Sequence, residues 1–215
     1  PYSDLIAVGD LTELLASGAI TPERAGTLIT GDIVKLTPTQ FHEIGNLPSG
    51  LVYTVDCSDK GNGKGTTLTL DGSTGNMDHS VLLSDCNLDF DDGASVVGSL
   101  VITLRDSNSS VIKAGQDTKI GDPTNGCHEE DRSIIMTVSP ISVPSEFIMS
   151  NVTLIVDNSV NIASATSSGK VSRGFAVYAT DTIDVASQHT FHSCGQESAL
   201  LAPEGKVIRL VMPPT

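Results

Sequence analysis

The stretch Val152-Thr-Leu-Ile-Val-Asp-Asn-Ser-Val-Asn-Ile-Ala-Ser164 is matched, 23 residues further on, by Phe175-Ala-Val-Tyr-Ala-Thr-Asp-Thr-Ile-Asp-Val-Ala-Ser187. Apolar positions align with apolar positions without a gap, and the polar centre Asp157-Asn158-Ser159 aligns with Thr180-Asp181-Thr182. Each copy is typical of two short strands joined by a polar corner. A repeat of this length fits one coil of a parallel β-solenoid.

Two β-hairpins of similar sequence in an antiparallel sheet would give the same pattern, and two copies do not distinguish the alternatives. Residues Leu100 to Gly115 look like a degenerate further copy, which favours the solenoid. We expect a mainly β fold of antiparallel sheets or a sandwich, and keep a short β-solenoid-like stack as the alternative.

The solenoid alternative makes a specific prediction about register. Apolar residues of the two copies should then stack in pairs and be buried, while Asp157 and Thr180 should lie outside at the polar corner. The predicted pairs are Leu154 with Val177 and Ile162 with Val185.

Most of the chain from residue 48 onward carries strand signals. Leu51–Cys57 and Thr66–Leu70 flank the glycine-rich segment Lys60–Gly65, which predicts a hairpin. The segment Gly61–Thr66 has the composition of a phosphate loop but lacks its spacing and lies between two strands, so a hairpin tip is the better interpretation. Further candidate strands cover residues 80–83, 96–104, 110–113, 133–138, 152–156, 160–163, 175–179, 183–186 and 207–212.

The first 47 residues differ from the rest and predict a helical N-terminal region followed by a β-rich domain over 48–215. Apolar residues between Leu5 and Leu15 follow helical spacing. Thr21-Pro22-Glu23 is a typical helix start. Thr37 and Gln40 stand in capping-box positions for a third short helix that should run to about Ile44.

Charge and composition exclude several classes of protein. The chain has 215 residues, with 12 Lys and Arg against 26 Asp and Glu, and a net charge of −14. A surface this acidic repels phosphate backbones and anionic lipid, so we expect no nucleic-acid partner and no peripheral membrane docking. Charged residues make up 18% and hydrophobic residues 39% of the chain, which argues against an acidic disordered protein.

The four cysteines are widely spaced and form no C-x-x-C pair. Two disulfides are therefore expected, and sequential pairing, Cys57 with Cys86 and Cys127 with Cys194, is our first choice among three connectivities. Disulfides indicate an extracellular or periplasmic location. No 18-residue apolar run occurs, so we expect that any signal peptide or membrane anchor has been removed.

Two groups of side chains have the chemistry of metal ligands. Asp85, Asp89, Asp91 and Asp92 crowd the stretch before Gly93 and could bind Ca²⁺, although they lack the EF-hand register and also fit a solvated acidic loop. The second group adjoins the predicted second disulfide and would form a transition-metal site if that disulfide brings its members together. Its members are His128, Glu129, His189 and His192.

Motifs for catalysis are absent from the sequence. No G-x-S-x-G elbow occurs, and nothing in the sequence groups a serine, a histidine and an aspartate into a triad. We therefore expect that the protein is not an enzyme and has no cofactor, with calcium as the one candidate. Asn108 and Asn151 stand in N-glycosylation sequons, which are near chance frequency in a chain this rich in Ser and Thr.

The region Val152–Cys194, with its two repeats and the ending Gln-His-Thr-Phe-His-Ser-Cys, resembles extracytoplasmic regions of bacterial pilus-assembly proteins. The likeness is to pseudopilins or minor pilins of the tight-adherence (Tad/Flp) type. It implies an N-terminal membrane helix followed by a β-rich, disulfide-bonded periplasmic or tip domain. No individual site residue carries over from it.

We therefore expect a non-catalytic structural subunit of the cell envelope or of an extracellular appendage, a minor pilin or an adhesin-like protein. Its partners would be other pilus or envelope subunits, and its only membrane contact a removed N-terminal helix. Two alternatives remain open: a Ca²⁺-dependent or carbohydrate-binding extracellular module, and a viral or phage structural protein.

Overall fold

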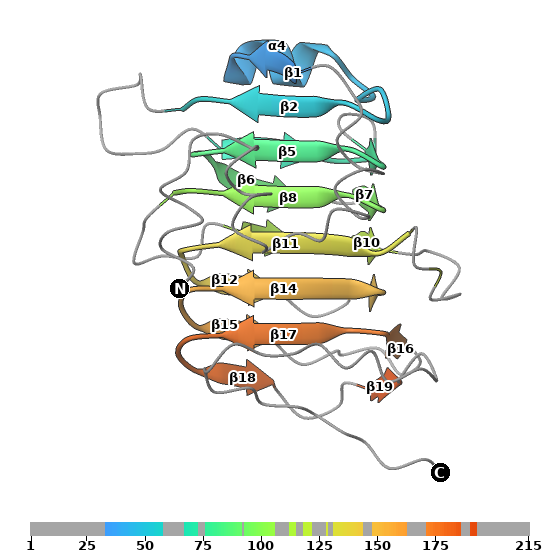
Figure 1. Cartoon of the computed structure of the whole chain (residues 1–215), viewed down its shortest axis with the longest axis vertical. Helices are drawn as coiled ribbons and strands as arrows, with labels where there is room; N and C mark the ends of the chain where they lie inside the picture. The colour runs from blue at the N-terminus through green and yellow to red at the C-terminus, as the bar shows by residue number, and fades with distance from the viewer. Residues whose placement is uncertain are drawn as a thin grey trace.

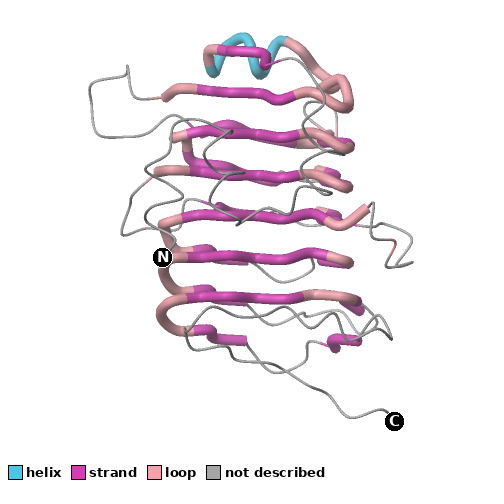
Figure 2. Tube along the Cα trace, viewed as in Figure 1, coloured by secondary structure: helices cyan, strands magenta, loops and turns pink. Residues whose placement is uncertain are grey.

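The computed structural model describes residues 33–57, 67–72, 76–91, 93–105, 112–114, 118–121, 128, 131–143, 148–162, 171–185 and 190–192. Their strands stack as successive coils along one axis (Figure 1). Figure 2 shows the same stack, with a single described helix at one end. The predicted helices before residue 33, the strand 207–212, and the segments 58–66 and 106–111 lie outside the described residues.

Each complete coil contributes one strand to each of three faces. The face that is foremost in Figure 1 is a seven-stranded sheet of β1 (Ile33–Leu36), β2 (Val52–Val55), β5 (Val81–Ser84), β8 (Leu100–Thr103), β11 (Ser133–Thr137), β14 (Val152–Val156) and β17 (Ala176–Ala179). The second is a six-stranded sheet of β3 (Thr67–Leu70), β6 (Asn87–Phe90), β9 (Ile112–Ala114), β12 (Ile141–Val143), β15 (Val160–Ile162) and β18 (Ile183–Val185).

The third face is split into two short sheets. Four strands form the first: β4 (Met77–Asp78), β7 (Ser95–Val97), β10 (Lys119–Gly121) and β13 (Ile148–Ser150). The last two coils supply the second, β16 (Val171–Arg173) and β19 (Thr190–His192).

Every described strand pair is parallel, so the antiparallel or sandwich expectation is wrong and the β-solenoid-like stack is the fold. The predicted hairpin is wrong for the same reason. β2 pairs with β1 and β5, whereas β3 pairs with β6 in another sheet. Each corner turns the chain onto a new face, and the partner of a strand lies one coil away along the chain rather than across a tight turn.

The predicted register of the repeat is confirmed. Leu154 pairs with Val177, and Ile162 pairs with Val185. Leu154 and Ile162 are fully buried, whereas Val177 and Val185 are only partly buried because they belong to the last described coil and have no described strand below them. Leu100–Gly115 does contain strands of a further coil, since β8 and β9 pair with β11 and β12.

The core fills the space between the three faces. Alternate residues of each strand point inward, as the two-residue period of a strand requires. The inward column of the seven-stranded sheet runs through successive coils in register, and its members pack on inward residues of the other two faces. It consists of Val34, Tyr53, Leu82, Val101, Ile135, Leu154 and Val177.

The outer side of the seven-stranded sheet is also apolar. A second cluster of six residues, each no more than 8% exposed, lies on the side away from the core: Val52, Val81, Leu100, Ile102, Ile134 and Met136. Strands buried on both faces read as nearly continuous apolar runs, such as Leu-Val-Ile-Thr in β8.

Helix α4 (Pro38–Glu43) closes one end of the stack, and its predicted start is confirmed. The Thr37 hydroxyl accepts a hydrogen bond from the Gln40 amide at 3.2 Å, and the Gln40 carboxamide accepts one from the Thr37 amide at 2.9 Å. Phe41 turns into the core and is 2% exposed, so the helix shields the first coil from water. β1 is a strand inside the region predicted to be helical, because it pairs in register with β2.

A column of buried serines lines the corner that leads into the seven-stranded sheet. Ser80, Ser99 and Ser133 occupy the same place in three successive coils. The Ser80 amide donates to Ser99 Oγ at 3.2 Å, and the Ser99 amide donates to Ser133 Oγ at 3.3 Å. These serine hydroxyls therefore satisfy the buried amides of Ser80 and Ser99 at the corner.

Candidate functional site

The first candidate lies at the corner between the seven-stranded and six-stranded sheets. Cys57 and Cys86 stand two residues beyond the ends of β2 and β5, so they occupy the same corner of successive coils. They form a disulfide with a Cα–Cα distance of 5.3 Å, and both are buried. The predicted Cys57–Cys86 pair is confirmed, while Cys127 and Cys194 lie outside the described residues.

Asp85 adjoins this disulfide and has a structural partner. Its Oδ1 accepts a hydrogen bond from the Cys57 amide at 2.6 Å. The ligand atoms of Cys57, Asp85 and Cys86 lie within 4.8 Å of one another, a spacing that would suit a metal ion. Sulfur atoms joined in a disulfide are not thiolates and do not ligate a metal, so this group is a covalent joint between coils with Asp85 as its hydrogen-bond acceptor.

The structure places Asp85 and Asp91, two of the four predicted calcium ligands, at opposite ends of β6. Asp85 precedes β6, Asp89 lies within it, and Asp91 follows it. β6 alone spans about 13 Å, so Asp85 and Asp91 are too far apart to share one ion at ordinary calcium–oxygen distances. The backbone of Asp91 forms the turn after β6, donating to Leu70 O at 2.8 Å and accepting from the Ala94 amide at 2.9 Å. Asp92 lies outside the described residues.

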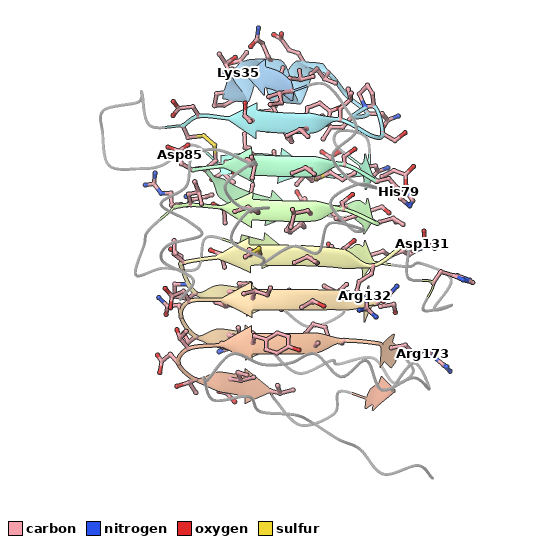
Figure 3. All side chains as sticks on the ribbon, viewed as in Figure 1. Lys35, His79, Asp85, Asp131, Arg132 and Arg173 are labelled. Atoms are coloured by element: carbon pink, nitrogen blue, oxygen red, sulfur yellow. A yellow bond between two sulfur atoms is a disulfide. The ribbon has the colours of Figure 1, made fainter. Side chains whose placement is uncertain are left out.

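A second group of polar side chains lies at the corner that carries the serine column. His79 Nδ1 lies 2.6 Å from Asp78 Oδ1, and His79 Nε2 lies 3.7 Å from Asp131 Oδ1. His79 has a backbone φ of 46°, a left-handed conformation that is uncommon outside glycine. In the coil between His79 and Asp131 the equivalent residue is Gly98, which has no side chain to separate the imidazole from the carboxylate. Figure 3 shows His79, Asp131, Arg132 and Arg173 along this edge, and Asp85 on the opposite edge.

Ser80, the serine that follows this histidine in the chain, is not placed as the nucleophile of a hydrolase. The neighbouring Ser80 is fully buried, and its hydroxyl donates to the backbone oxygens of Asp78 at 2.9 Å and Pro48 at 3.3 Å. The arrangement of His79 between two carboxylates therefore links coils and does not activate Ser80.

The predicted histidine site divides between two parts of the stack. His128 is exposed and lies at the corner of Asp131, whose amide donates to the His128 carbonyl at 3.2 Å. His192 is in the last coil, in register with Arg173. Glu129 and His189 lie outside the described residues.

Of the two sequons, only Asn151 is described, and it is fully buried. Its Oδ1 accepts a hydrogen bond from Arg132 Nε at 2.9 Å, and its Nδ2 donates to the His128 carbonyl. Its φ of 59° places it at the same left-handed corner as His79 and Gly98. Asn tolerates this conformation better than most residues, so the side chain serves the corner.

Residues 10–195 match a protein-family model described as "Domain of unknown function (DUF7867)". The chain belongs to the DUF7867 family. The matched range includes every described strand, from β1 to β19. No curated protein and no solved structure matches the chain. None of the described helices of this family member is long and apolar enough to cross a membrane.

The contact between His79 and Asp131 is not visible in the sequence. The two residues are 52 positions apart in sequence, and they meet because the coils stack in register with only one coil between them. A signal was present in the glycine or asparagine that recurs at one register position just before strands of the seven-stranded sheet, at Gly50, Gly98, Asn151 and Gly174. Aligning these residues would have placed His79 in the same column.

Proposed function

We propose that this DUF7867 domain is a non-catalytic structural subunit of a cell envelope or an extracellular appendage. The observation that supports this most is the buried disulfide between Cys57 and Cys86. Stable structural disulfides form in oxidising compartments such as the periplasm and the cell exterior. A location outside the cytoplasm is part of the proposal.

The architecture also supports a structural role. Each coil of the stack hydrogen-bonds to its neighbours through strands on up to three faces, and one core cluster runs from Phe41 near the capped end to Ile162. Displacing an inner coil of such a stack would break hydrogen bonds on more than one face, which suits a structural subunit. In this proposal its partners are other subunits of the appendage or envelope, as in the minor pilins that the sequence resembles.

The test examines the protein in cells of its source organism. Intact cells are treated with iodoacetamide, the protein is isolated without reductant, and mass spectrometry reads each cysteine. We expect Cys57 and Cys86 to be unalkylated and joined. Cell fractionation should place the protein outside the cytoplasm, and cross-linking of intact cells should join it to envelope or appendage proteins. Alkylated Cys57 and Cys86 in a cytosolic, uncross-linked protein would overturn the proposal.

A further inference from the structure

The outward side of the six-stranded sheet differs in chemistry from that of the seven-stranded sheet. Its inward residues, such as Leu68, Leu88 and Ile162, are buried in the core. The described strand residues that alternate with them are all polar and at least partly exposed. We call these residues the polar face: Thr67, Thr69, Asn87, Asp89, Ser142, Asn161 and Asp184.

The polar face is regular along the solenoid axis. Thr69 pairs with Asp89 in the next coil. Further along, Ser142 pairs with Asn161, and Asn161 pairs with Asp184. Parallel pairing sets these side chains about 4.8 Å apart, in one row about 24 Å long over six strands. In the backbone register, position 113 of β9 lies between Asp89 and Ser142.

The chemistry of the polar face selects one class of ligand. The residues of the polar face include no large apolar side chain. Interfaces with a protein partner usually need such a side chain as a central anchor, so a protein ligand is disfavoured. The carboxylates of the polar face, in a chain of net charge −14, repel nucleic acid and acidic polymers. Hydroxyl, amide and carboxylate groups that repeat along a rigid row suit a neutral polymer whose own hydroxyl groups repeat.

We infer that the polar face binds a neutral, extended polysaccharide whose chain lies along the solenoid axis. Asp89 and Asp184 accept hydrogen bonds from sugar hydroxyls, and Asn161 both donates and accepts. Most of these side chains are short and lose little conformational freedom on binding. The inference rests on the register and exposure of this sheet and is independent of the proposed structural role.

Recognition of this kind should depend on the length of the ligand. The described part of the polar face has no aromatic side chain on which a sugar ring could stack. Each sugar unit therefore contributes only hydrogen bonds that compete with water, and useful affinity requires many units held at once. A polymer should bind where a short oligosaccharide of the same sugar does not.

The test uses the full chain and measures co-sedimentation with microcrystalline cellulose, as well as affinity electrophoresis in hydroxyethylcellulose. The binding variant is Asn161→Ala with Asp184→Ala, and a second one is Thr69→Ala with Asp89→Ala at the other end of the row. Each should weaken binding about tenfold or more. Lys119→Ala is the matched control, because Lys119 is an exposed outward strand residue of another face, and it should bind like the wild type.

The outcomes separate the inference from its rivals. Binding that persists in EDTA, is not displaced by cellotetraose and is lost in both double variants supports it. Absence of binding to both cellulose probes overturns it, as do stronger binding to polygalacturonate, binding only with added calcium, or equal loss in Lys119→Ala. Melting curves of all variants check that the substitutions leave the protein folded. None of these results bears on the cysteine oxidation state or cell location that test the proposed function.

Discussion

At the scale of single residues, the effect of a buried hydroxyl on the free energy of unfolding depends on whether it has a hydrogen-bond partner. Ser84, the last residue of β5, and Ser99, which directly precedes β8, are both buried. Ser99 Oγ donates to Val97 O at 2.7 Å and accepts from the Ser80 amide. Ser84 Oγ points inward from β5 and finds no hydrogen-bond partner among the described residues.

We expect Ser84→Ala to leave the free energy of unfolding unchanged or to raise it by about 1 kcal/mol, because it removes a buried, unpaired hydroxyl. Ser99→Ala should lower it by about 1 to 3 kcal/mol, because the Ser80 amide then loses its acceptor. Urea unfolding of both variants measures the difference. A loss at Ser84 as large as that at Ser99 would contradict the prediction.

Tyr53 carries a pH-dependent part of the stability. Burial raises the pKa of Tyr53 above its usual value of 10, and its hydroxyl donates to Pro48 O at 2.7 Å. The folded protein therefore holds this proton more tightly than the unfolded chain. The corresponding stability is complete below pH 10 and is lost as the pH rises through the pKa of the folded state.

Tyr53→Phe should lower the free energy of unfolding by about 1 kcal/mol at pH 7, because the hydrogen bond to Pro48 is lost. Between pH 10 and 12 its stability should decline less steeply than that of the wild type. Denaturant unfolding at several pH values tests both parts. Parallel declines would show that Tyr53 does not titrate differently on folding.

At the scale of elements, the cost of truncating a core residue depends on its coil. Leu154 of β14 has strands on both sides, whereas its partner Val177 belongs to the last described strand of the sheet. Leu154 is fully buried and Val177 only partly buried. Because coils lie on both sides of Leu154, the surrounding structure cannot close the cavity that its truncation would leave.

Leu154→Ala should therefore lower the free energy of unfolding by about 3 to 5 kcal/mol, and Val177→Ala by no more than about 2 kcal/mol. At the corner between these strands, Thr180 Oγ1 donates to Asp157 Oδ1 at 2.9 Å on the surface. Thr180→Ala should change stability by less than about 0.5 kcal/mol and serves as the control. Equal losses for the two core variants would contradict the prediction that burial and flanking strands set the cost.

At the scale of the whole molecule, the disulfide fastens the coils next to the helical cap. It joins residues 29 apart in sequence, for which chain entropy predicts a contribution of about 3 to 4 kcal/mol. The joint lies near one end of a stack in which each coil contacts only its neighbours. Loss of the disulfide should therefore reduce local stability most at that end of the stack.

The double variant Cys57→Ala with Cys86→Ala should be less stable by about 3 to 4 kcal/mol. Amide hydrogen exchange should show a larger loss of protection in β2 than in β14, because local unfolding begins at the released end. Equal loss of protection in both strands would show that the stack unfolds as one unit.

Local signals in the sequence were sufficient for several features. The capping box of Thr37 and Gln40 predicted helix α4, because a cap depends on residues three positions apart. The aligned repeat predicted the pairing of Leu154 with Val177, because its two copies have no insertion between equivalent residues. The spacing of the cysteines and the sequential pairing predicted the Cys57–Cys86 disulfide.

Tertiary structure alone decided strand direction, the apolar outer sheet face and the polar corner of His79. The paired residues Val52, Val81, Leu100, Ile134, Thr153 and Ala176 give coil lengths of 29, 19, 34, 19 and 23 residues, so insertions hide the repeat from a search at fixed period. A strand sequence encodes which side chains are apolar but not the direction of a partner a whole coil away. Stacking of the coils supplies that direction, and with it the meeting of His79 with Asp131 and the alignment of the polar face.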